Sequence, residues 1–213
     1  MGKRIVGLQN PEFLHIADDG GECVYGCEQE WYGTLWQQRA GCGPCVASNI
    51  MMYLHVGGKL VLPYDLPGKA GCIRLMEDMW GHITPTRHGV NTVRHFSDGL
   101  HAFAVNHGYR LDCDALLYPA QPDLRPDFKR VVSFLAEGLE MDCPVAFLNL
   151  SNGKVENLDA WHWVTIVRME IDSGSDQVFI EIYDGITSAM IDLKTWCETT
   201  TEDGGFVHFR RIE

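Results

Sequence analysis

Three residues that lie far apart in the sequence have the types needed for a nucleophile, a base and a carboxylate that orients the base. Cys42 stands in the run Gly41-Cys42-Gly43-Pro44-Cys45, where a helix is expected to begin. At a helix N-terminus, unpaired backbone N–H groups and the helix dipole stabilise a thiolate. His162 and Asp184 lie 22 positions apart on two strand-like segments. A thiolate beside an imidazole and a carboxylate is suited to covalent acyl transfer.

The two strand-like segments are expected to form one antiparallel hairpin. Residues 161–170 and 177–184 are joined by the polar sequence Asp172-Ser173-Gly174-Ser175-Asp176, which is typical of a turn. A chain that folds back near residue 173 or 174 places His162 opposite a position within about two residues of Asp184. Side chains at such positions can touch across the strands.

Composition and charge exclude several classes of protein. The 213 residues contain 17 Lys and Arg against 29 Asp and Glu, a net charge of −12, and the basic residues form no run. This balance argues against nucleic-acid binding. There is no apolar signal-peptide core and no apolar stretch near the roughly 18 residues of a membrane helix, so we expect a cytoplasmic protein without membrane contact. We expect the eight cysteines to be mostly reduced, with no cofactor and no bound metal.

The expected elements indicate an α+β protein, because helices dominate up to residue 143 and strands follow Pro144. We expect one domain over 1–213, with a helical lobe over about 1–143 and an antiparallel sheet lobe over about 144–213. Cys42 and His162 would face each other across the cleft. Apolar spacing predicts helices over about 44–54, 70–81, 90–106 and 126–141, and strands over 145–150, 161–170, 177–184, 189–193 and 206–210.

Three short motifs carry a resemblance to a known superfamily. They are Gln-Gln-Arg-Ala-Gly-Cys-Gly-Pro-Cys-Val-Ala-Ser-Asn from residue 37, Trp-His-Trp-Val-Thr-Ile-Val from residue 161, and Ile-Tyr-Asp-Gly from residue 182. Together they resemble the papain-like cysteine peptidases. The nearest likeness is to the bacterial branch of double-glycine-leader (bacteriocin-processing) peptidases and their stand-alone relatives.

The resemblance implies a two-lobed papain-like fold and a peptide or a small amide or acyl substrate. It implies Cys42 as nucleophile, His162 as base and acid, and Asp184 as the orienting carboxylate. It further implies a glutamine oxyanion donor, for which Gln37 is the first choice and Gln38 the second. Water would resolve the thioester in a hydrolase, and an amine or thiol in an acyltransferase; these residues do not decide between the two. Gly43 is expected to let the substrate approach the backbone.

Other interpretations of the cysteines stay open at this point. Cys42-Gly43-Pro44-Cys45 is also the dithiol sequence of thioredoxins, although residues 31–40 do not form the buried strand that precedes it there. Cys23, Cys27, Cys42 and Cys45 have spacing that suits a four-thiolate zinc site. A third alternative keeps the papain-like fold but makes it an inactive module that binds a peptide or a partner.

The remaining candidates have structural explanations. Trp161 and Trp163 should point to the same face of a strand and belong to the core. Asp159 is expected in solvent, Asn49 beside polar neighbours, and Cys45 on the helix behind Cys42. The spacing of five histidines does not bring two of them onto one helix turn, so we expect them at the surface or the rim of the cleft: His82, His88, His95, His101 and His107.

Overall fold

The described part of the chain contains one large antiparallel sheet. The computed structural model describes residues 2–17, 20–172, 174–175 and 177–211; Ser173 and Asp176 of the predicted turn lie outside the described residues. The strands of this sheet are β1 (Lys3–Gly7), β4 (Leu111–Tyr118), β5 (Val145–Asn149), β6 (His162–Asp172), β7 (Gln177–Asp184), β8 (Thr187–Asp192) and β9 (Gly204–Arg211). Their order is β4-β9-β5-β6-β7-β8, and β1 pairs with the end of β6 beyond its pairing with β5.

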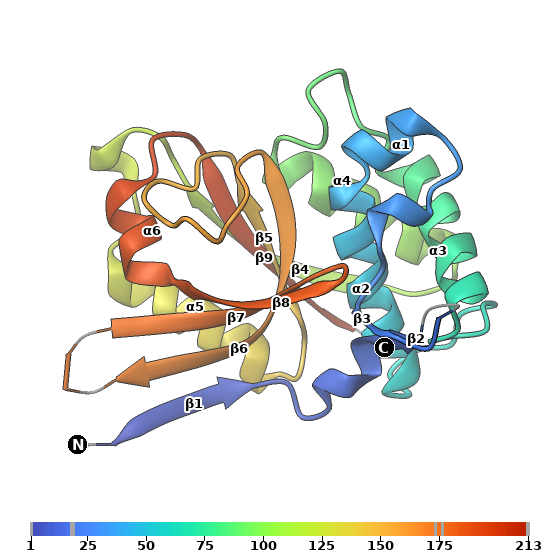
Figure 1. Cartoon of the computed structure of the whole chain (residues 1–213), viewed down its shortest axis with the longest axis horizontal. Coiled ribbons are helices and arrows are strands. Elements are labelled where there is room, and N and C mark those ends of the chain that lie inside the picture. The colour runs from blue at the N-terminus through green and yellow to red at the C-terminus, as the bar shows by residue number, and fades with distance from the viewer. Residues whose placement is uncertain (1, 18–19, 173, 176, 212–213) are drawn as a thin grey trace.

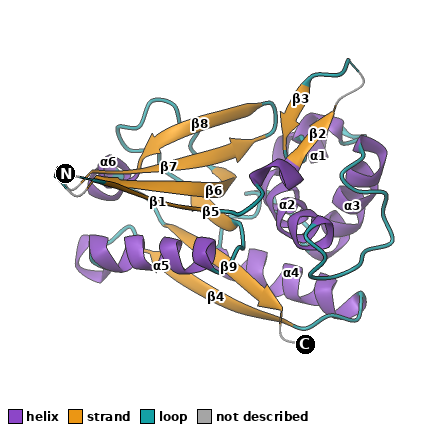
Figure 2. Ribbon diagram, turned by 90° about the horizontal axis from the view of Figure 1, so that it is seen from below, coloured by secondary structure: helices purple, strands orange, loops and turns teal. Residues whose placement is uncertain are grey.

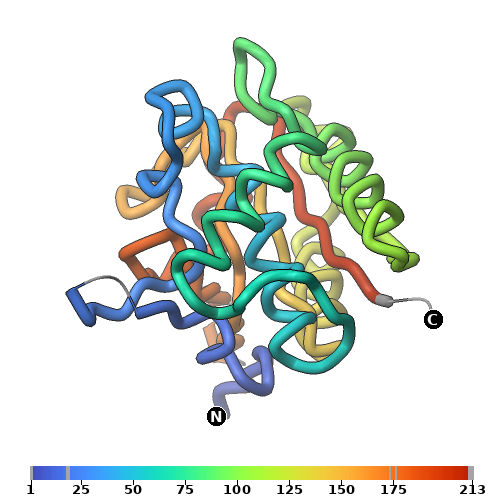
Figure 3. Tube along the Cα trace, turned by 90° about the vertical axis from the view of Figure 1, so that its right-hand side faces the viewer, coloured from blue at the N-terminus to red at the C-terminus, as the bar shows by residue number. Residues whose placement is uncertain are grey.

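Helices lie beside the sheet and across it (Figures 1 and 2). The helices are α1 (Leu35–Ala40), α2 (Cys42–Val56), α3 (Lys69–His82), α4 (Val93–Asn106), α5 (Phe128–Glu140) and α6 (Leu193–Thr199). Helices α1 to α3 gather beside one end of the strands, together with the small sheet of β2 (His15–Ala17) and β3 (Cys23–Tyr25). Helix α5 packs on β1, β5, β6 and β9, whereas α6 packs on β7. The tube in Figure 3 shows β9 passing beside α4.

The α+β class and the four long helices agree with the sequence prediction, but the predicted division into two ranges does not match the sheet. Strands β1 and β4 come from the first 143 residues and lie in the large sheet. Neither shows a clear apolar alternation: β1 has one buried residue, and β4 is buried only at its two ends. Such partly exposed strands carry a weak sequence signal, because they are placed by pairing with strands far away in the chain.

Helix α2 is the buried centre of the helical part, and it fixes that part to the sheet. All residues from Gly43 to Leu54 are buried, so the helix is covered on every side. Asn49 makes the polar contact within this packing. Its Oδ1 accepts from the backbone N–H of Cys27 at 2.7 Å, and its Nδ2 donates to Oγ1 of Thr165 in β6 at 3.0 Å. Asn49 therefore joins α2 to both the N-terminal segment and the sheet.

Among the described residues, no helix is long and apolar enough to cross a membrane.

The contacts of Asn49 predict a measurable cost of its removal. Asn49→Ala would leave the buried N–H of Cys27 without an acceptor, which typically costs about 1–3 kcal/mol. We expect urea denaturation to show a decrease of that size in the free energy of unfolding. The dependence of this free energy on urea concentration should not change. Gln121→Ala, at an exposed position where the side chain makes no capping hydrogen bond, is the matched control and should change stability by no more than about 0.5 kcal/mol. Equal effects of the two substitutions would contradict the role given to Asn49.

Candidate active site

Cys42 is the first residue of α2, as the sequence predicts, and it is half-buried. Its N–H group is in the first helical turn, where N–H groups have no acceptor within the helix. The space above Gly43 is filled by Val90, whose side chain would lie 3.0 Å from a Cβ at that position. Gly43 is therefore needed for the packing of Val90. That it also lets a substrate approach the backbone stays a prediction.

His162 and Asp184 meet as the hairpin predicts. Nε2 of His162 and Oδ1 of Asp184 lie 2.8 Å apart. The strand register also explains why they share a face. It shifts by one residue between Ile166 and Arg168, so that Thr165 pairs with Tyr183. Continued by one residue, this register places Asp184 opposite Val164, which has the same orientation as His162. Without the shift, Asp184 would face the other side of the sheet.

The imidazole of His162 lines one cavity with Cys42 and Asp184 and interacts with both side chains. Burial alone would lower the pKa of His162, but hydrogen bonds with Asp184 and Cys42, and the negative charges of both, raise it to about 10. Only 19% of the side chain is exposed. The arrangement therefore favours a protonated imidazole beside the sulfur atom.

The turn after Asp184 is tied to the N-terminal segment. The backbone N–H of Tyr25 donates to the carbonyl of Gly185 at 2.7 Å, and the N–H of Ile186 donates to the Glu28 carboxylate at 3.1 Å. Gly185 has a φ of +56°, and a Cβ there would overlap that carboxylate. The position of Asp184 thus depends on a segment about 160 residues away in the sequence.

Two cavities meet at Cys42. The first, here the histidine cavity, has a volume of about 330 Å³ and is lined by His162 and by the carboxylates of Glu28, Glu30, Asp159 and Asp184. The second, here the tryptophan–arginine cavity, has a volume of about 370 Å³ and is lined by Trp36, Arg39, Arg87 and Trp161. A substrate bound across Cys42 could thus occupy a different cavity on each side of the reacting bond.

The structure does not bring the predicted glutamines to Cys42. Oε1 of Gln37 accepts from the Thr34 hydroxyl at 2.8 Å, and Nε2 donates to the Glu77 carboxylate at 2.7 Å. Gln38 donates to the carbonyls of Glu30 and Tyr32. Neither is among the described residues that line the two cavities.

A third glutamine, which the sequence motifs do not indicate, lines the histidine cavity together with Cys42. Gln29 lies there, its Nε2 bonded to the carbonyl of Gln38 and its Oε1 buried without a partner among the described residues. It precedes Cys42 by 13 positions and lies before the motif that begins at residue 37, so no sequence signal pointed to it.

The other cysteines near the site differ from Cys42 in burial or in the pKa of the thiol. Cys27 is fully buried, and a hydrogen bond with Cys72, followed by burial, raises its pKa well above the ordinary value. Burial, followed by the charge of Cys42, raises the pKa of Cys45 in the same direction. Cys23 is exposed on β3. Among the described residues, no group of His, Cys, Asp or Glu has the arrangement to hold a metal ion, so the zinc alternative gains no support from the geometry.

The two tryptophans around His162 differ in their environments. Trp163 is buried, stacks on Phe96 at 4.2 Å and donates from Nε1 to the carbonyl of Val90, as expected of a core residue. Trp161 is 56% exposed and has a φ of +57°. The expectation that it belongs to the core was wrong, because β6 begins only at His162 and the strand alternation does not extend to Trp161.

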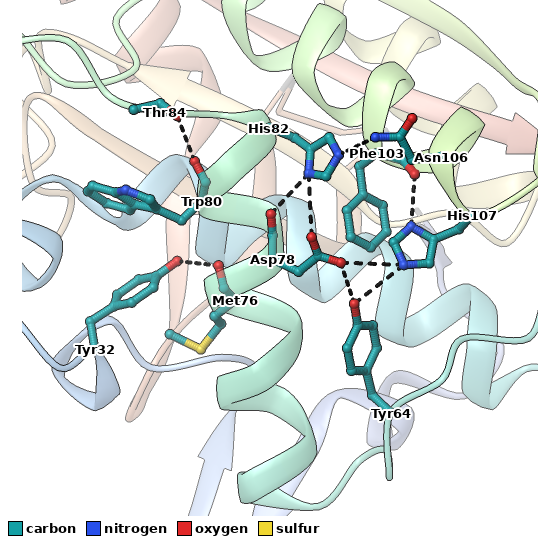
Figure 4. Close-up of polar contacts among 10 residues, drawn as sticks. All are labelled: Tyr32, Tyr64, Met76, Asp78, Trp80, His82, Thr84, Phe103, Asn106 and His107. Carbon is teal, nitrogen blue, oxygen red and sulfur yellow. Dashed lines mark hydrogen bonds and ion pairs between the residues drawn. The ribbon is translucent and has the colours of Figure 1, made fainter.

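The five histidines between residues 82 and 107 do not share one environment. His88 lines the tryptophan–arginine cavity. His82 and His107 are half-buried and meet at Asp78, where Tyr64 also donates to the carboxylate (Figure 4). Spacing along one helix could not predict this cluster, because His82 ends α3 and His107 follows α4.

Comparison with known proteins supports the fold. No protein-family model and no curated protein matches the sequence. Among solved structures, the chain is similar to the crystal structure of UfSP from C. elegans, with a TM-score of 0.60 and 12% sequence identity. The match covers 99% of this chain and 35% of the UfSP chain, so this chain spans about a third of the length of that protein.

UfSP is a papain-like cysteine protease. The chain therefore has the α+β, papain-like fold that the motifs predicted. At this level of identity the similarity shows the fold alone. It does not support the finer likeness to the bacterial leader-peptidase branch.

The turn at Gly185 yields one prediction. Gly185→Ala should destabilise the protein by about 1–2 kcal/mol through its positive φ, with a further cost because Glu28 must move. Displacement of the turn should also lower any activity that needs Asp184. Gly58→Ala is the matched control, since Gly58 has a φ of +71° and nothing within 4 Å of a Cβ. Thermal unfolding in which both variants lose the same stability would show that Glu28 does not constrain the turn.

The surroundings of His162 yield a second prediction. NMR titration of the imidazole should show protonation up to about pH 10, and Asp184→Asn should lower that pKa. Because the folded pKa lies above the unfolded value of about 6.5, the stabilisation is complete below pH 6.5 and is lost as the pH rises through about 10. Asp159 lines the same cavity, so Asp159→Asn is the control and should leave the pKa of His162 unchanged. An unshifted titration in Asp184→Asn would contradict the pairing.

Proposed function

We propose that this protein is a cysteine hydrolase that cleaves an amide or peptide bond through a thioester on Cys42. One observation carries the proposal: His162 is hydrogen-bonded to the carboxylate of Asp184 and lines one cavity together with Cys42, whose thiol also lines a second cavity that could hold a substrate. The papain-like fold supports the same assignment. A cytoplasmic location is part of the proposal.

The proposed reaction begins with the Cys42 thiolate and the His162 imidazolium. The sulfur attacks the carbonyl carbon, and the carbon–nitrogen bond breaks as His162 gives its proton to the departing amine. His162, now neutral, takes a proton from water, and the resulting hydroxide attacks the thioester. The carbon–sulfur bond then breaks, releasing a carboxylic acid and restoring the thiolate. Asp184 keeps the ring oriented and stabilises its charge in both steps.

The negative oxygen of the intermediate needs hydrogen-bond donors. The N–H of Cys42, in the first turn of α2, is proposed as one donor. Gln37 is a candidate for the second only if its amide leaves Glu77. Gln29 needs a smaller change, because it already lines the histidine cavity. If an amine or thiol took the place of water, the same residues would perform acyl transfer.

The proposal is tested by mapping the reactive thiol and the residues that activity requires. Limiting iodoacetamide should modify Cys42 first, because Cys45 and Cys27 are buried with raised pKa values. In a screen of fluorogenic peptide amides, Cys42→Ala and His162→Ala should each lower kcat/KM by at least about 10³. Cys45→Ala, three residues from Cys42 and buried, is the control and should retain most activity.

Two results would count against the hydrolase. Faster labelling of Cys45 or Cys23 than of Cys42 would contradict the assignment of Cys42 as the nucleophile. Reduction of insulin disulfides that requires both thiols would favour the dithiol alternative.

A further inference from the structure

The two cavities beside Cys42 have opposite charge. The described residues that line the histidine cavity include four carboxylates and no Lys or Arg, whereas those of the tryptophan–arginine cavity include Arg39 and Arg87 and no Asp or Glu. The whole chain carries a net charge of −12. A carboxylate-free wall with two arginines is therefore a local reversal of the charge of the protein.

Both guanidinium groups are available to a ligand. Arg39 and Arg87 are exposed, and neither makes an ion pair with a carboxylate of the described residues. Nε of Arg87 donates to Nε2 of His88 at 2.9 Å, which leaves its two terminal nitrogens free. Such a planar pair of nitrogens suits a carboxylate, which it can bind through two parallel hydrogen bonds.

The backbone positions Arg87 and His88 at the cavity. Thr86 and Gly89 exchange two backbone hydrogen bonds, of 3.1 and 2.9 Å, so Arg87 and His88 form the tip of a tight turn. Gly89 supplies the positive φ of +71° that the turn requires. Trp36 and Trp161 are 47% and 56% exposed and give the cavity an apolar surface. An aromatic surface beside two arginines can bind a short chain with both apolar and anionic parts.

The proposed reaction decides which part of the substrate lies here. His162 gives its proton to the departing amine, so the leaving group is on the side of the histidine cavity. The acyl group stays on the sulfur of Cys42. It therefore lies on the other side, in the tryptophan–arginine cavity, which Cys42 also lines.

We propose, resting on the hydrolase function above, that the tryptophan–arginine cavity selects substrates with an acidic residue on the acyl side of the cleaved bond. The ligand class is an acidic peptide segment, with Asp or Glu within one or two residues of the reacting carbonyl. Arg39 and Arg87 bind its carboxylates, and Trp36 and Trp161 cover its aliphatic parts.

The test measures binding, so that it does not depend on hydrolysis. The full chain with Cys42→Ala is titrated with N-acetyl-Glu-Glu-Gly amide, with the neutral equivalent N-acetyl-Gln-Gln-Gly amide, and with N-acetyl-Lys-Lys-Gly amide. Tryptophan fluorescence and calorimetry are the readouts. We expect the Glu peptide to bind about tenfold more tightly than the Gln peptide at 50 mM salt, the Lys peptide to bind most weakly, and the preference to shrink at 0.5 M salt.

Substitutions locate the effect. Arg39→Gln and Arg87→Gln should each reduce the preference for Glu over Gln by about threefold, in line with the strength of exposed ion pairs. Arg110→Gln removes the same charge from an exposed position outside both cavities and should leave the preference unchanged.

The proposal is overturned if the Glu and Gln peptides bind equally, if neither binds at up to 5 mM, or if Arg110→Gln acts as strongly as the two cavity variants. Failure of the hydrolase proposal alone would give a different result. The wild-type protein would then show no peptidase activity, but the Cys42→Ala protein would still bind the Glu peptide more tightly than the Gln peptide.

Discussion

The contact between α2 and β6 is the constraint on which the candidate site depends. Asn49 lies two turns after Cys42 on α2, and Thr165 lies three residues after His162 on β6, so their hydrogen bond fixes the start of the helix relative to the start of the strand. The second bond of the same amide, from the N–H of Cys27, holds the N-terminal segment against them. A buried amide with both ends satisfied gives a single arrangement, because any shift leaves a polar group unpaired.

The electrostatics of the site follow from this packing. A buried imidazole would ordinarily lose its proton, yet the hydrogen bonds and negative charges of Asp184 and Cys42 raise the pKa of His162 to about 10. Asp184 is in turn held by a turn that is bonded to Tyr25 and Glu28. The proposed chemistry therefore needs α2, β6, β7 and the N-terminal segment together, and a change in any of them should affect both stability and reactivity.

Much of this arrangement could be predicted from the sequence, because its strongest signals are local. The helix after Cys42 follows from Pro44 and the apolar run, and the meeting of His162 and Asp184 follows from one hairpin. The register shift at residue 167 puts the two side chains on the same face, but no residue pattern near it in the sequence indicates the shift. The sequence likewise contains no pattern that predicts the pairing of β1 and β4 with distant strands.

Two side chains point elsewhere than the sequence indicates. The resemblance implies Gln37 as an oxyanion donor, but the amide of Gln37 is hydrogen-bonded to Thr34 and Glu77. Strand alternation places Trp161 in the core, but its positive φ turns it toward solvent before the strand begins. In both cases tertiary contacts or backbone conformation decided the direction of the side chain, and neither can be inferred from spacing.

The most direct test of the central claim is to trap the acyl-enzyme. The protein is mixed with the p-nitrophenyl ester of N-acetylglycine, quenched in acid within milliseconds to seconds, and measured by intact-mass spectrometry with peptide mapping. The account predicts a single N-acetylglycyl group on Cys42, removable by hydroxylamine, that forms much more slowly in His162→Ala. Acylation at another residue, or an equal rate of Cys42 acylation without His162, would contradict it.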